Sequence, residues 1–367
     1  MSSTVTTQAG EMTASVMDEA RSGLRLSVLP VTGEPGRLRE VLDLLAANDL
    51  QLDADVEFFV TAHVGPDLVA CVGLAGSVIK CLSAAASVQG QGVAAPLMQR
   101  MFYEAVDRGR GTLFAFTKPC NRLTLESLGF TFLAEVPGAA VLLENSPFAL
   151  ELYLDELRAL REPGDRVGAV VLHANPFTLG HLHLLRTAAE QVDVLHVFVV
   201  AEHAPGAFSP DLRLRLVREG VVEAGVENIR VHRGSRYIVS RATFPNYFLA
   251  KEDTRVQAAA GLDLQLFRRH IGPALGVTDR FVGTEPLSAV TASYNVEMRR
   301  WLQEAPSDSP PIRVHEVPRV YLDGGPVSAS RVRAALEAGD EETVARLVPA
   351  PTLAHPRSRF VSDRQEQ

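Results

Sequence analysis

The spacing of apolar and polar positions changes near the middle of this chain, and the change predicts two α/β domains. In the first 145 residues, apolar runs at 68–75 and 78–84 are short and nearly continuous, as in buried strands, and an amphipathic segment at 96–108 predicts a helix. From residue 167 onward, apolar strand-like runs alternate with helix-like segments. That alternation is typical of a doubly wound parallel sheet. The sequence therefore predicts an α/β protein whose second half is Rossmann-like.

Turn-forming residues place the boundary between the two halves. Asn145-Ser-Pro147 ends the first pattern, a helix-like stretch follows, and Glu162-Pro-Gly-Asp165 forms a turn. The first 22 residues are rich in Ser, Thr and Ala and lack the basic start and apolar core of a signal peptide. We predict a disordered tail at 1–22, a first domain at 23–145, a linker at 146–166, a second domain at 167–350 and a C-terminal tail at 351–367.

Polar residues follow the predicted strands of the second domain. These strands lie at 168–174, 193–201, 229–233, 279–283 and 312–317, with helices predicted at 181–191, 211–223, 246–275 and 289–302. Ligands of such sheets bind beyond the carboxyl ends of the strands. Residues that come directly after a strand are therefore candidates for a common site.

The run Asn175-Pro-Phe-Thr-Leu-Gly-His181 stands between the first of these strands and a helix. Gly180 permits close approach of backbone and phosphate, the first amides of the helix point at an anion, and His181 adds a donor. With Thr178 the run reads T-x-G-H, which resembles the HxGH signature of nucleotidylyltransferases with threonine in place of the first histidine. A lone Gly-His before a helix is common, so the motif needs support from elsewhere in the chain.

A second helix start near the end of the chain supplies that support. Val327-Ser-Ala-Ser-Arg-Val-Arg333 begins a helix-like segment and resembles the I-S-x-[ST]-x-x-R motif of the same superfamily. Ser328 and Ser330 can cap the helix, and its amide end and Arg333 can hold terminal phosphates. Two such helix starts in the expected order indicate a nucleotide site more strongly than either one.

A glycine-rich loop in the first domain indicates a second anion site. Val88-Gln-Gly-Gln-Gly-Val-Ala94 separates a strand from a helix, and its Gln89, Gly92 and Ala94 match the [QR]-x-x-G-x-[GA] loop of GNAT-type acetyltransferases. Small residues there expose consecutive N–H groups to a pyrophosphate. The alternative is a tight turn without a ligand. The match implies a GNAT-like fold, whether or not the domain is catalytic.

Composition restricts the class of partner. The net charge is -8, and no basic stripe emerges, which argues against a nucleic-acid partner. No uninterrupted apolar run reaches membrane-spanning length, so we expect no membrane partner. Cys71, Cys81 and Cys120 are odd in number and widely spaced, which fits neither a zinc site nor a disulfide framework. We therefore expect a cytoplasmic protein without a bound metal centre.

Several segments together are similar to the citrate lyase ligase family. They are Ala174–His181, His232–Phe248, Phe267–Leu275, Arg280–Pro286, Val290–Asn295 and Val327–Arg333. The resemblance covers roughly residues 25–350 and includes the GNAT-like domain. It implies that ATP and acetate form acetyl-AMP and pyrophosphate. The acetyl group then passes to the thiol of the phosphoribosyl-dephospho-coenzyme A arm on the acyl-carrier subunit of citrate lyase.

On this resemblance the two motifs hold the triphosphate. His181 contacts the phosphate oxygens in the transition state, and Thr178 adds a hydroxyl donor. Ser328, Ser330 and Arg333 hold the β- and γ-phosphates. Such catalysis consists mainly of positioning and electrostatic stabilisation.

The remaining nucleotide contacts follow from the same resemblance. Asn175 and Phe177 would shape the near wall of the adenosine pocket, and Gly283 and Thr284 would approach the adenine or ribose. Glu285 would serve the ribose hydroxyls or the hydration shell of Mg²⁺. The metal ion is expected from ATP chemistry, since the sequence shows no dedicated carboxylate cage.

Three arginines between a strand and a helix are candidates for the second substrate. Arg233, Arg236 and Arg241 would bind acetate or the phosphate-rich carrier arm; the alternative is a solvated basic loop. His173 and His196 lie in apolar strands, where a hydrogen-bonded core histidine is the expectation.

Two further hypotheses remain open from the sequence. T-x-G-H alone also permits a nucleotidylyltransferase that acts on a phosphorylated cofactor precursor such as phosphopantetheine. The GNAT-like domain, in turn, either transfers the acetyl group or only docks the carrier.

Overall fold

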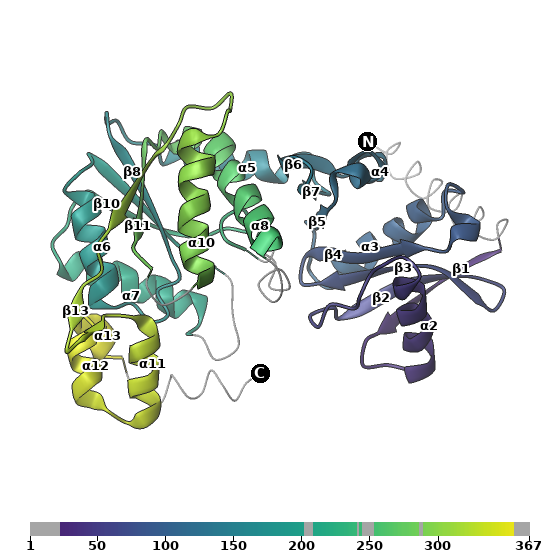
Figure 1. Cartoon of the computed structure of the whole chain (residues 1–367), viewed down its shortest axis with the longest axis horizontal. Coiled ribbons are helices and arrows are strands. Elements are labelled where there is room, and N and C mark those ends of the chain that lie inside the picture. The colour runs from purple at the N-terminus through teal and green to yellow at the C-terminus, as the bar shows by residue number, and fades with distance from the viewer. Residues whose placement is uncertain (1–22, 202–207, 241, 244–252, 286–288, 356–367) are drawn as a thin grey trace, which may run out of the picture. The chain divides into compact units, whose positions relative to one another are not determined.

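The computed structural model describes residues 23–201, 208–240, 242–243, 253–285 and 289–355. The chain forms two compact units. The first comprises the described residues as far as Leu133 together with Val141–Pro147, and the second comprises Ala134–Ala140 and the described residues from Phe148 onward. Figure 1 shows both units as mixtures of helices and strands.

One seven-stranded sheet organises the amino-terminal part of the chain. Its strands are β1 (Leu24–Pro30), β2 (Phe58–Val64), β3 (Asp67–Ala75), β4 (Val78–Ala84), β5 (Phe114–Thr117), β6 (Thr131–Val136) and β7 (Ala140–Glu144). They are ordered β1-β2-β3-β4-β5-β7-β6. Strands β1 to β4 pair antiparallel, whereas β4 and β5 run parallel. This is the predicted GNAT-like arrangement, in which a helix connects the parallel pair.

Helices cover both faces of this sheet. The helices are α2 (Pro35–Ala46), α3 (Ala94–Asp107) and α4 (Arg122–Ser127), with short 3-10 turns η1 (Ala86–Val88) and η2 (Pro119–Asn121). Successive strand residues point to opposite faces. Accordingly, Phe58 and Val60 pack with the α3 side chains, and Phe59 between them packs with α2. The connection from β4 through α3 to β5 therefore places the glycine-rich loop at the start of α3.

A five-stranded parallel sheet organises the second unit. Its strands are β8 (Val167–Leu172), β9 (Val194–Val199), β10 (Ile229–Arg233), β11 (Asp279–Gly283) and β12 (Arg313–Val317). The order is β10-β9-β8-β11-β12, and every neighbouring pair is parallel. The chain first builds outward from β8 to β10 and then returns to add β11 on the other side of β8. The topological switch point thus lies between β8 and β11, where sheets of this kind bind ligands.

Helices connect these strands in the predicted order. They are α5 (Ala149–Ala159), α6 (Leu179–Ala189), α7 (Pro210–Glu223), α8 (Asp253–Leu266), α9 (Gly272–Leu275), α10 (Ala289–Met298), α11 (Ala329–Ala338), α12 (Glu341–Leu347) and α13 (Ala350–Leu353). Two π-helical segments, η4 (Phe267–Ile271) and η5 (Arg299–Glu304), continue α8 and α10, and β13 (Tyr321–Leu322) pairs with β14 (Gly325–Pro326). No described helix is long and apolar enough to cross a membrane.

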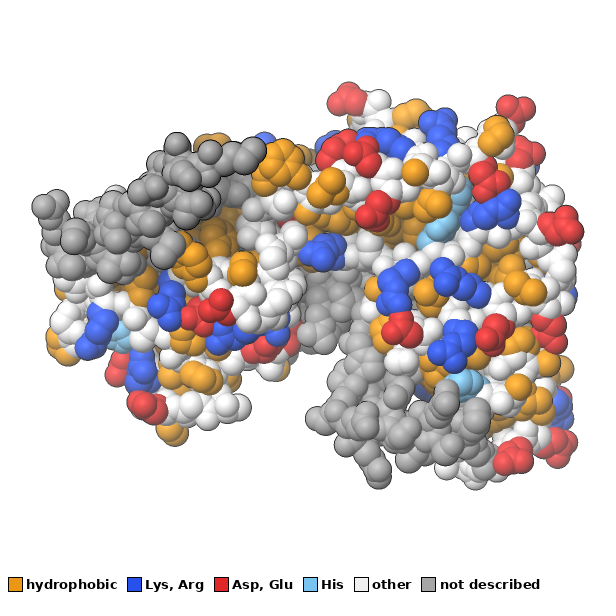
Figure 2. Space-filling view, turned by 180° about the vertical axis from the view of Figure 1, so that it is seen from behind, with side chains coloured by type: hydrophobic (Ala, Val, Ile, Leu, Met, Phe, Trp, Pro, Cys, Tyr) orange, Lys and Arg blue, Asp and Glu red, His pale blue; other side chains and the backbone are white. Residues whose placement is uncertain are grey.

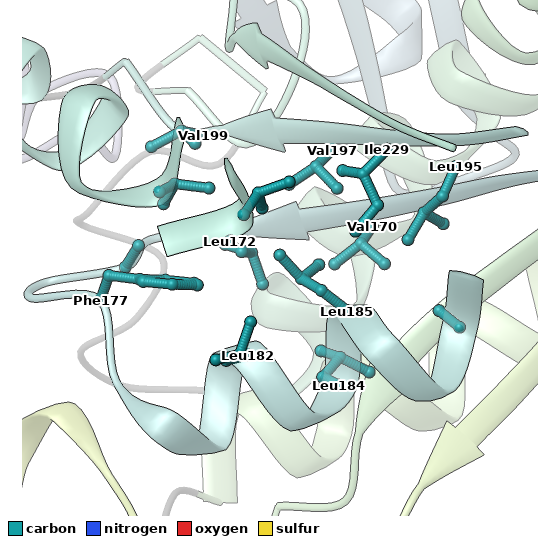
Figure 3. Packing of buried hydrophobic residues seen from close by; sticks show 14 of the residues in the cluster. Val170, Leu172, Phe177, Leu182, Leu184, Leu185, Leu195, Val197, Val199 and Ile229 are labelled. Carbon is teal, nitrogen blue, oxygen red and sulfur yellow. The ribbon is translucent and has the colours of Figure 1, made fainter. Parts of the chain in front are cut away.

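The core of the second unit lies between the sheet and the helices α6 and α7. Figure 3 shows side chains of α6, such as Leu182 and Leu185, directed at strand residues such as Val170 and Leu172. Every residue of β9 is buried. This packing fixes the start of α6 against the end of β8.

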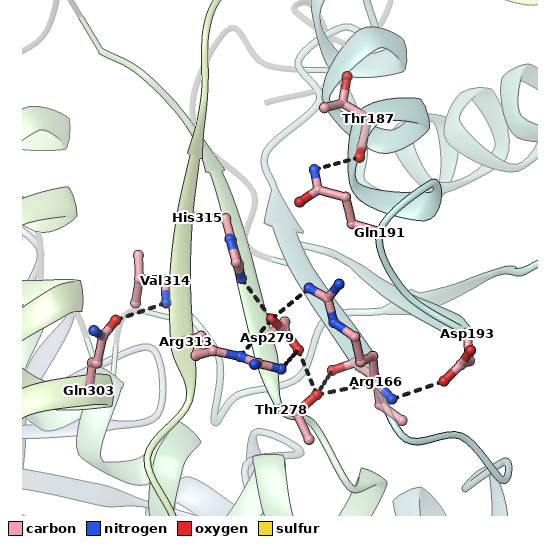
Figure 4. A network of polar contacts seen from close by, with 11 residues as sticks. Arg166, Thr187, Gln191, Asp193, Thr278, Asp279, Gln303, Arg313, Val314 and His315 are labelled. Carbon is pink, nitrogen blue, oxygen red and sulfur yellow. Dashed lines mark hydrogen bonds and ion pairs between the residues drawn. The ribbon is translucent and has the colours of Figure 1, made fainter.

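A buried ion cluster joins the amino ends of β8, β11 and β12 (Figure 4). Asp279 is fully buried and accepts hydrogen bonds from Arg313 at 3.0 Å, Arg166 at 3.2 Å and Thr278 at 2.7 Å, and it lies 2.6 Å from His315. Burial opposes the charged form of this carboxyl, but its hydrogen bonds outweigh burial and lower its pKa to about 2. The cluster holds β8, β11 and β12 together far from their carboxyl ends.

The helix-like stretch predicted within the linker at 146–166 is α5, whose Leu154 and Leu157 are buried because the helix is amphipathic. The C-terminal tail at 351–367 begins inside α13, where Thr352 is buried. Residues 356–367 and the predicted tail at 1–22 lie outside the described residues.

Candidate functional site

The T-x-G-H run lies at the switch point, between the end of β8 and the start of α6. Thr178 is the N-cap of α6, and its hydroxyl accepts a hydrogen bond from the backbone N–H of His181. In return, the His181 ring accepts a hydrogen bond from the backbone N–H of Thr178 at 3.1 Å. This reciprocal capping box fixes both side chains at the amide end of the helix.

These contacts determine which nitrogen of His181 carries the hydrogen. A backbone N–H can only donate, so Nδ1 must accept and the neutral ring carries its hydrogen on Nε2. Burial, and then the charges of Arg319 and His173, lower the pKa of His181 to about 4. At neutral pH, His181 is therefore a neutral donor through Nε2.

The second motif meets the first in space. Ser328 is the N-cap of α11, and its hydroxyl accepts from the N–H of Arg331 at 3.2 Å. A Cβ at Gly180 would lie 2.8 Å from the carbonyl oxygen of Val327. The starts of α6 and α11 are thus in direct contact, and only glycine fits at position 180 without displacing Val327.

The guanidinium of Arg333 provides a second link between the motifs. It donates to the carbonyl oxygen of Asn175 at 2.7 Å and to the hydroxyl of Ser330 at 3.1 Å. Ser330 is exposed, whereas Ser328 is buried. The structure therefore brings Thr178, His181, Ser328, Ser330 and Arg333 together around two adjoining helix starts, where orphan amides favour an anion.

The ends of β11 and β12 add further polar groups to this edge of the sheet. Gly283 ends β11, and a Cβ built there would meet nothing within 4 Å, so space is open beside it. The backbone N–H of Thr284 donates to Val317 O at 3.0 Å. Arg319, which follows β12, donates to Thr284 O at 2.5 Å and forms an ion pair with Glu285.

Two residues of this edge were missed by the sequence analysis. Arg319 lies two residues beyond the predicted strand at 312–317, whereas Thr284 was selected because it directly follows a strand. His173, expected to be a core histidine, has an exposed side chain. Its charge is among the causes that lower the pKa of His181.

Asn175 and Phe177 make contacts inside the protein that stabilise the candidate site. The Asn175 side chain accepts from the backbone N–H of Phe208 at 2.9 Å. Phe177 is fully buried, stacks on the His181 ring at 5.9 Å between centroids and lies against Gly220. The predicted pocket wall is therefore corrected for Phe177: its apolar ring lies in the core beneath His181.

A buried arginine stabilises the loop between β8 and α6. Arg213 in α7 is 2% exposed and donates to Phe208 O at 3.0 Å and to His173 O at 2.7 Å. These bonds hold the chain after β8 against α7. The peptide bond between Asn175 and Pro176, in the same loop, is cis.

Two of the three candidate arginines after β10 lie within the described residues. Arg233 ends β10 and forms an exposed ion pair with Asp211. The backbone carbonyl of Arg236 accepts from the hydroxyl of Ser240 at 2.6 Å. Arg241 lies outside the described residues.

The glycine-rich loop of the first unit has the geometry of a tight turn at a helix start. Gly92 adopts φ +78°, and a Cβ there would meet nothing within 4 Å. Gln89 donates to the carbonyl oxygen of Ala84 at 3.1 Å, and Ala94 is the first residue of α3. The open backbone of the loop suits the close approach of a ligand.

No group of three or more His, Cys, Asp or Glu side chains among the described residues is arranged to hold a metal ion. On the face in Figure 2, basic and acidic side chains are interspersed with apolar ones. Cys71, Cys81 and Cys120 are free thiols, and burial raises the pKa of Cys71 to about 12.

The parallel sheet, its switch point and the paired helix starts define a Rossmann-like α/β domain, preceded in the chain by a GNAT-like unit. Residues 167–355 match the family model for the citrate lyase ligase C-terminal domain. A [citrate [pro-3S]-lyase] ligase of Escherichia coli is 42% identical over 91% of this chain and 94% of that protein. One of Klebsiella pneumoniae is 44% identical over 86% of this chain and 92% of that protein.

The chain belongs to the citrate lyase ligase family. Among solved structures, that of Escherichia coli ElaA is similar to part of this chain. The match covers 34% of this chain and 99% of ElaA, with 15% sequence identity and a TM-score of 0.31.

Proposed function

We propose that this enzyme uses ATP to activate acetate as acetyl-AMP and then acetylates the carrier thiol of citrate lyase. The observation that carries the proposal is the contact between the starts of α6 and α11, with a neutral His181 donor between them. Family membership supplies the reaction class, because both curated relatives described above are ligases that act on citrate lyase. These relatives do not favour the alternative, a nucleotidylyltransferase acting on phosphopantetheine.

The first step consists of one displacement at the α-phosphorus of ATP. A carboxylate oxygen of acetate forms the new bond to phosphorus, and the bond to the bridging oxygen of pyrophosphate breaks. No proton is transferred, so the protein has to hold the reactants in line and stabilise charge on the phosphoryl oxygens.

The helix starts suit this task. The Nε2–H of His181 and the amides of α6 would donate to the α-phosphate, while Ser330 and Arg333 at α11 would hold the β- and γ-phosphates. Arg319 adds a positive charge at the same edge of the sheet. Gly283, with open space beside it, would admit the ribose or adenine. The magnesium ion would be held by phosphate oxygens and water, because Glu285 is engaged by Arg319.

The second step transfers the acetyl group. The carrier thiolate attacks the acetyl carbonyl carbon, a thioester forms, and AMP leaves with the electron pair of the broken anhydride bond. We propose that the Gln89–Ala94 loop docks the phosphate-rich arm of the carrier, since its open backbone lies at the start of α3. This unit would then serve transfer, not adenylation.

The adenylation step is tested by exchange of labelled pyrophosphate into ATP. Exchange should require acetate, and His181→Ala should slow it about 10²–10³-fold, as expected for removal of one transition-state donor. His183→Ala is the matched control, because His183 lies two residues further along the same helix and faces another side. Exchange driven by phosphopantetheine without acetate, or near-normal exchange in a folded His181→Ala variant, refutes the proposal.

The docking role is tested separately. Gly92→Asp introduces a negative charge and a strained backbone into the loop, so it should abolish carrier acetylation and leave pyrophosphate exchange intact. Gly109→Asp is the control, since Gly109 follows the other end of α3 with a similar φ of +73°. Equal carrier acetylation by the two variants contradicts the docking role.

A further inference from the structure

Two nitrogens of a buried arginine in β11 have no hydrogen-bond partner among the described residues. Arg280 is 3% exposed, and neither its Nε nor its Nη1 finds an acceptor among the described residues. Its neighbour Phe281 packs with the α6 side of the sheet, so Arg280 points to the opposite face. There, its guanidinium carbon lies 4.6 Å from the centre of the Phe267 ring. This stacking leaves the hydrogen-bonding edge of the guanidinium without an acceptor.

Other buried arginines of this unit are fully engaged. Arg268 donates to four backbone carbonyls, at 2.8–3.2 Å, and Arg213 donates to two. A buried charge without hydrogen bonds is costly, and such a group in a native protein requires an explanation. Arg280 differs from these structural arginines in that no carbonyl satisfies it.

The nearest buried acid is already occupied. Asp263 in α8 accepts from the N–H of Val239 at 2.7 Å and from the hydroxyl of Tyr294 at 2.7 Å, and Thr243 also hydrogen-bonds to it. Asp263 attracts Arg280 through the protein interior, but the two groups form no ion pair. Arg280 therefore keeps its capacity for an external acceptor.

The surroundings of Arg280 are continuous with the candidate nucleotide site. Tyr294 and Asn295 are consecutive in α10, and the Asn295 side chain donates to the carbonyl oxygen of Gly283 at 3.1 Å. Val282, two residues beyond Arg280 on the same face of β11, is only partly buried. The cluster thus extends from Arg280 to the carboxyl end of its strand.

We propose that Arg280 binds the carboxylate of the acid substrate. This inference rests on the proposed activation of acetate. A guanidinium presents parallel N–H donors that match the two oxygens of a carboxylate. The phosphates of ATP have their own donors at the starts of α6 and α11, at the carboxyl edge of the sheet. A small anion that enters beside Gly283 would satisfy Arg280 and lie between it and the nucleotide.

The test measures the Michaelis constants for acetate and ATP separately in the pyrophosphate exchange assay. Arg280→Gln should raise KM for acetate about 10- to 100-fold, the effect of losing charge-assisted hydrogen bonds, with KM for ATP within about twofold of wild type. Arg280→Lys keeps the charge without the paired donors and should give a smaller rise. Arg269→Gln, at an exposed position of η4, is the control for loss of one positive charge.

The outcomes separate this inference from the function on which it depends. Absence of acetate-dependent exchange in the wild-type enzyme would overturn the proposed function itself. Unchanged KM for acetate in folded Arg280 variants, or equal rises in both constants, would overturn only the role of Arg280. Because Arg280→Gln removes a buried charge, thermal unfolding of each variant is recorded first, and Arg280→Lys decides the question if the glutamine variant does not fold.

Discussion

Replacement of Gly180 by alanine tests the contact on which the proposed phosphate site depends. The added Cβ would lie 2.8 Å from the backbone oxygen of Val327, whereas ordinary contact begins at 3.4 Å. The Val327 carbonyl or the start of α6 must therefore move by about 0.6 Å. Because Val327 directly precedes the N-cap of α11, this movement separates the two helix starts.

Two opposing effects set the expected stability of this variant. Alanine is favoured over glycine inside a helix by about 0.8–1.0 kcal/mol, and less at the first turn. Overpacking against backbone costs about 1–3 kcal/mol. We expect a net loss of about 0–2 kcal/mol in the free energy of unfolding, which leaves the protein folded at the assay temperature.

The effect on catalysis should be larger than the effect on stability. A misplacement of about 1 Å in an active site costs about 10²-fold in rate, so a shift of this size should slow acetate-dependent exchange about 10- to 100-fold. The assay is pyrophosphate exchange at saturating ATP and acetate, with thermal unfolding recorded in parallel.

A matched variant shows whether the loss comes from the contact. Gly36→Ala places a methyl group near the start of α2, where nothing lies within 4 Å, so exchange should be unchanged. If Gly180→Ala exchanges pyrophosphate as fast as wild type, close contact between the helix starts is not required and the reasoning fails.

Three further predictions concern stability. Asp279→Asn should lower the free energy of unfolding by about 1–3 kcal/mol in urea titrations at pH 7. Because the pKa of Asp279 is lowered to about 2, the wild type should lose this contribution as pH falls from about 4 to about 2, and the variant should not. Burial, and then the charge of the other ring, lowers the pKa of His196 to about 4, while burial and nearby arginines do the same for His232. Both rings are neutral in the folded protein, so stability should fall between pH 6.5 and about 4, and His232→Gln should flatten that slope. Phe177→Ala should cost about 3–5 kcal/mol in urea unfolding, because its ring is fully buried beneath His181; a cost below 1 kcal/mol contradicts the assignment of Phe177 to the core.

The sheets could be predicted well because their strands are buried runs bounded by turns. The predicted strands at 78–84, 229–233 and 279–283 coincide with β4, β10 and β11. The hairpin of β6 and β7 was not predicted, although Pro137 and Gly138 mark its turn. Their short apolar runs do not by themselves distinguish a strand from a segment of a buried helix.

The continuous helix predicted at 246–275 is divided in the structure. Over the described part of this range, α8 is followed by the π-helical η4 and by α9, which ends at Gly276 with φ +79°. A period of 3.6 residues does not distinguish an α-helix from one with a wide turn inserted, so only the end at Gly276 is visible in the sequence.

The candidate site likewise contains residues that the sequence predicts and residues that it does not. The caps at Thr178 and Ser328 could be predicted because capping is a local property of a helix start, whereas the phosphate contact of His181 stays a prediction. Arg319 and Arg280 could not be assigned, since their roles depend on which groups the fold places around them. Arg280 lies in an apolar strand, and only the structure shows that its guanidinium lacks an acceptor.

The contact between Gly180 and Val327 also bears on the order in which the site is made. A nascent chain that has reached Val317 carries all five strands of the parallel sheet, yet only one of the two helix starts. The contact joins residues about 150 positions apart in the sequence. It can therefore form only after all strands of the parallel sheet have been synthesised. A chain that ends before Val327 would therefore lack the second helix start that the proposed triphosphate site requires.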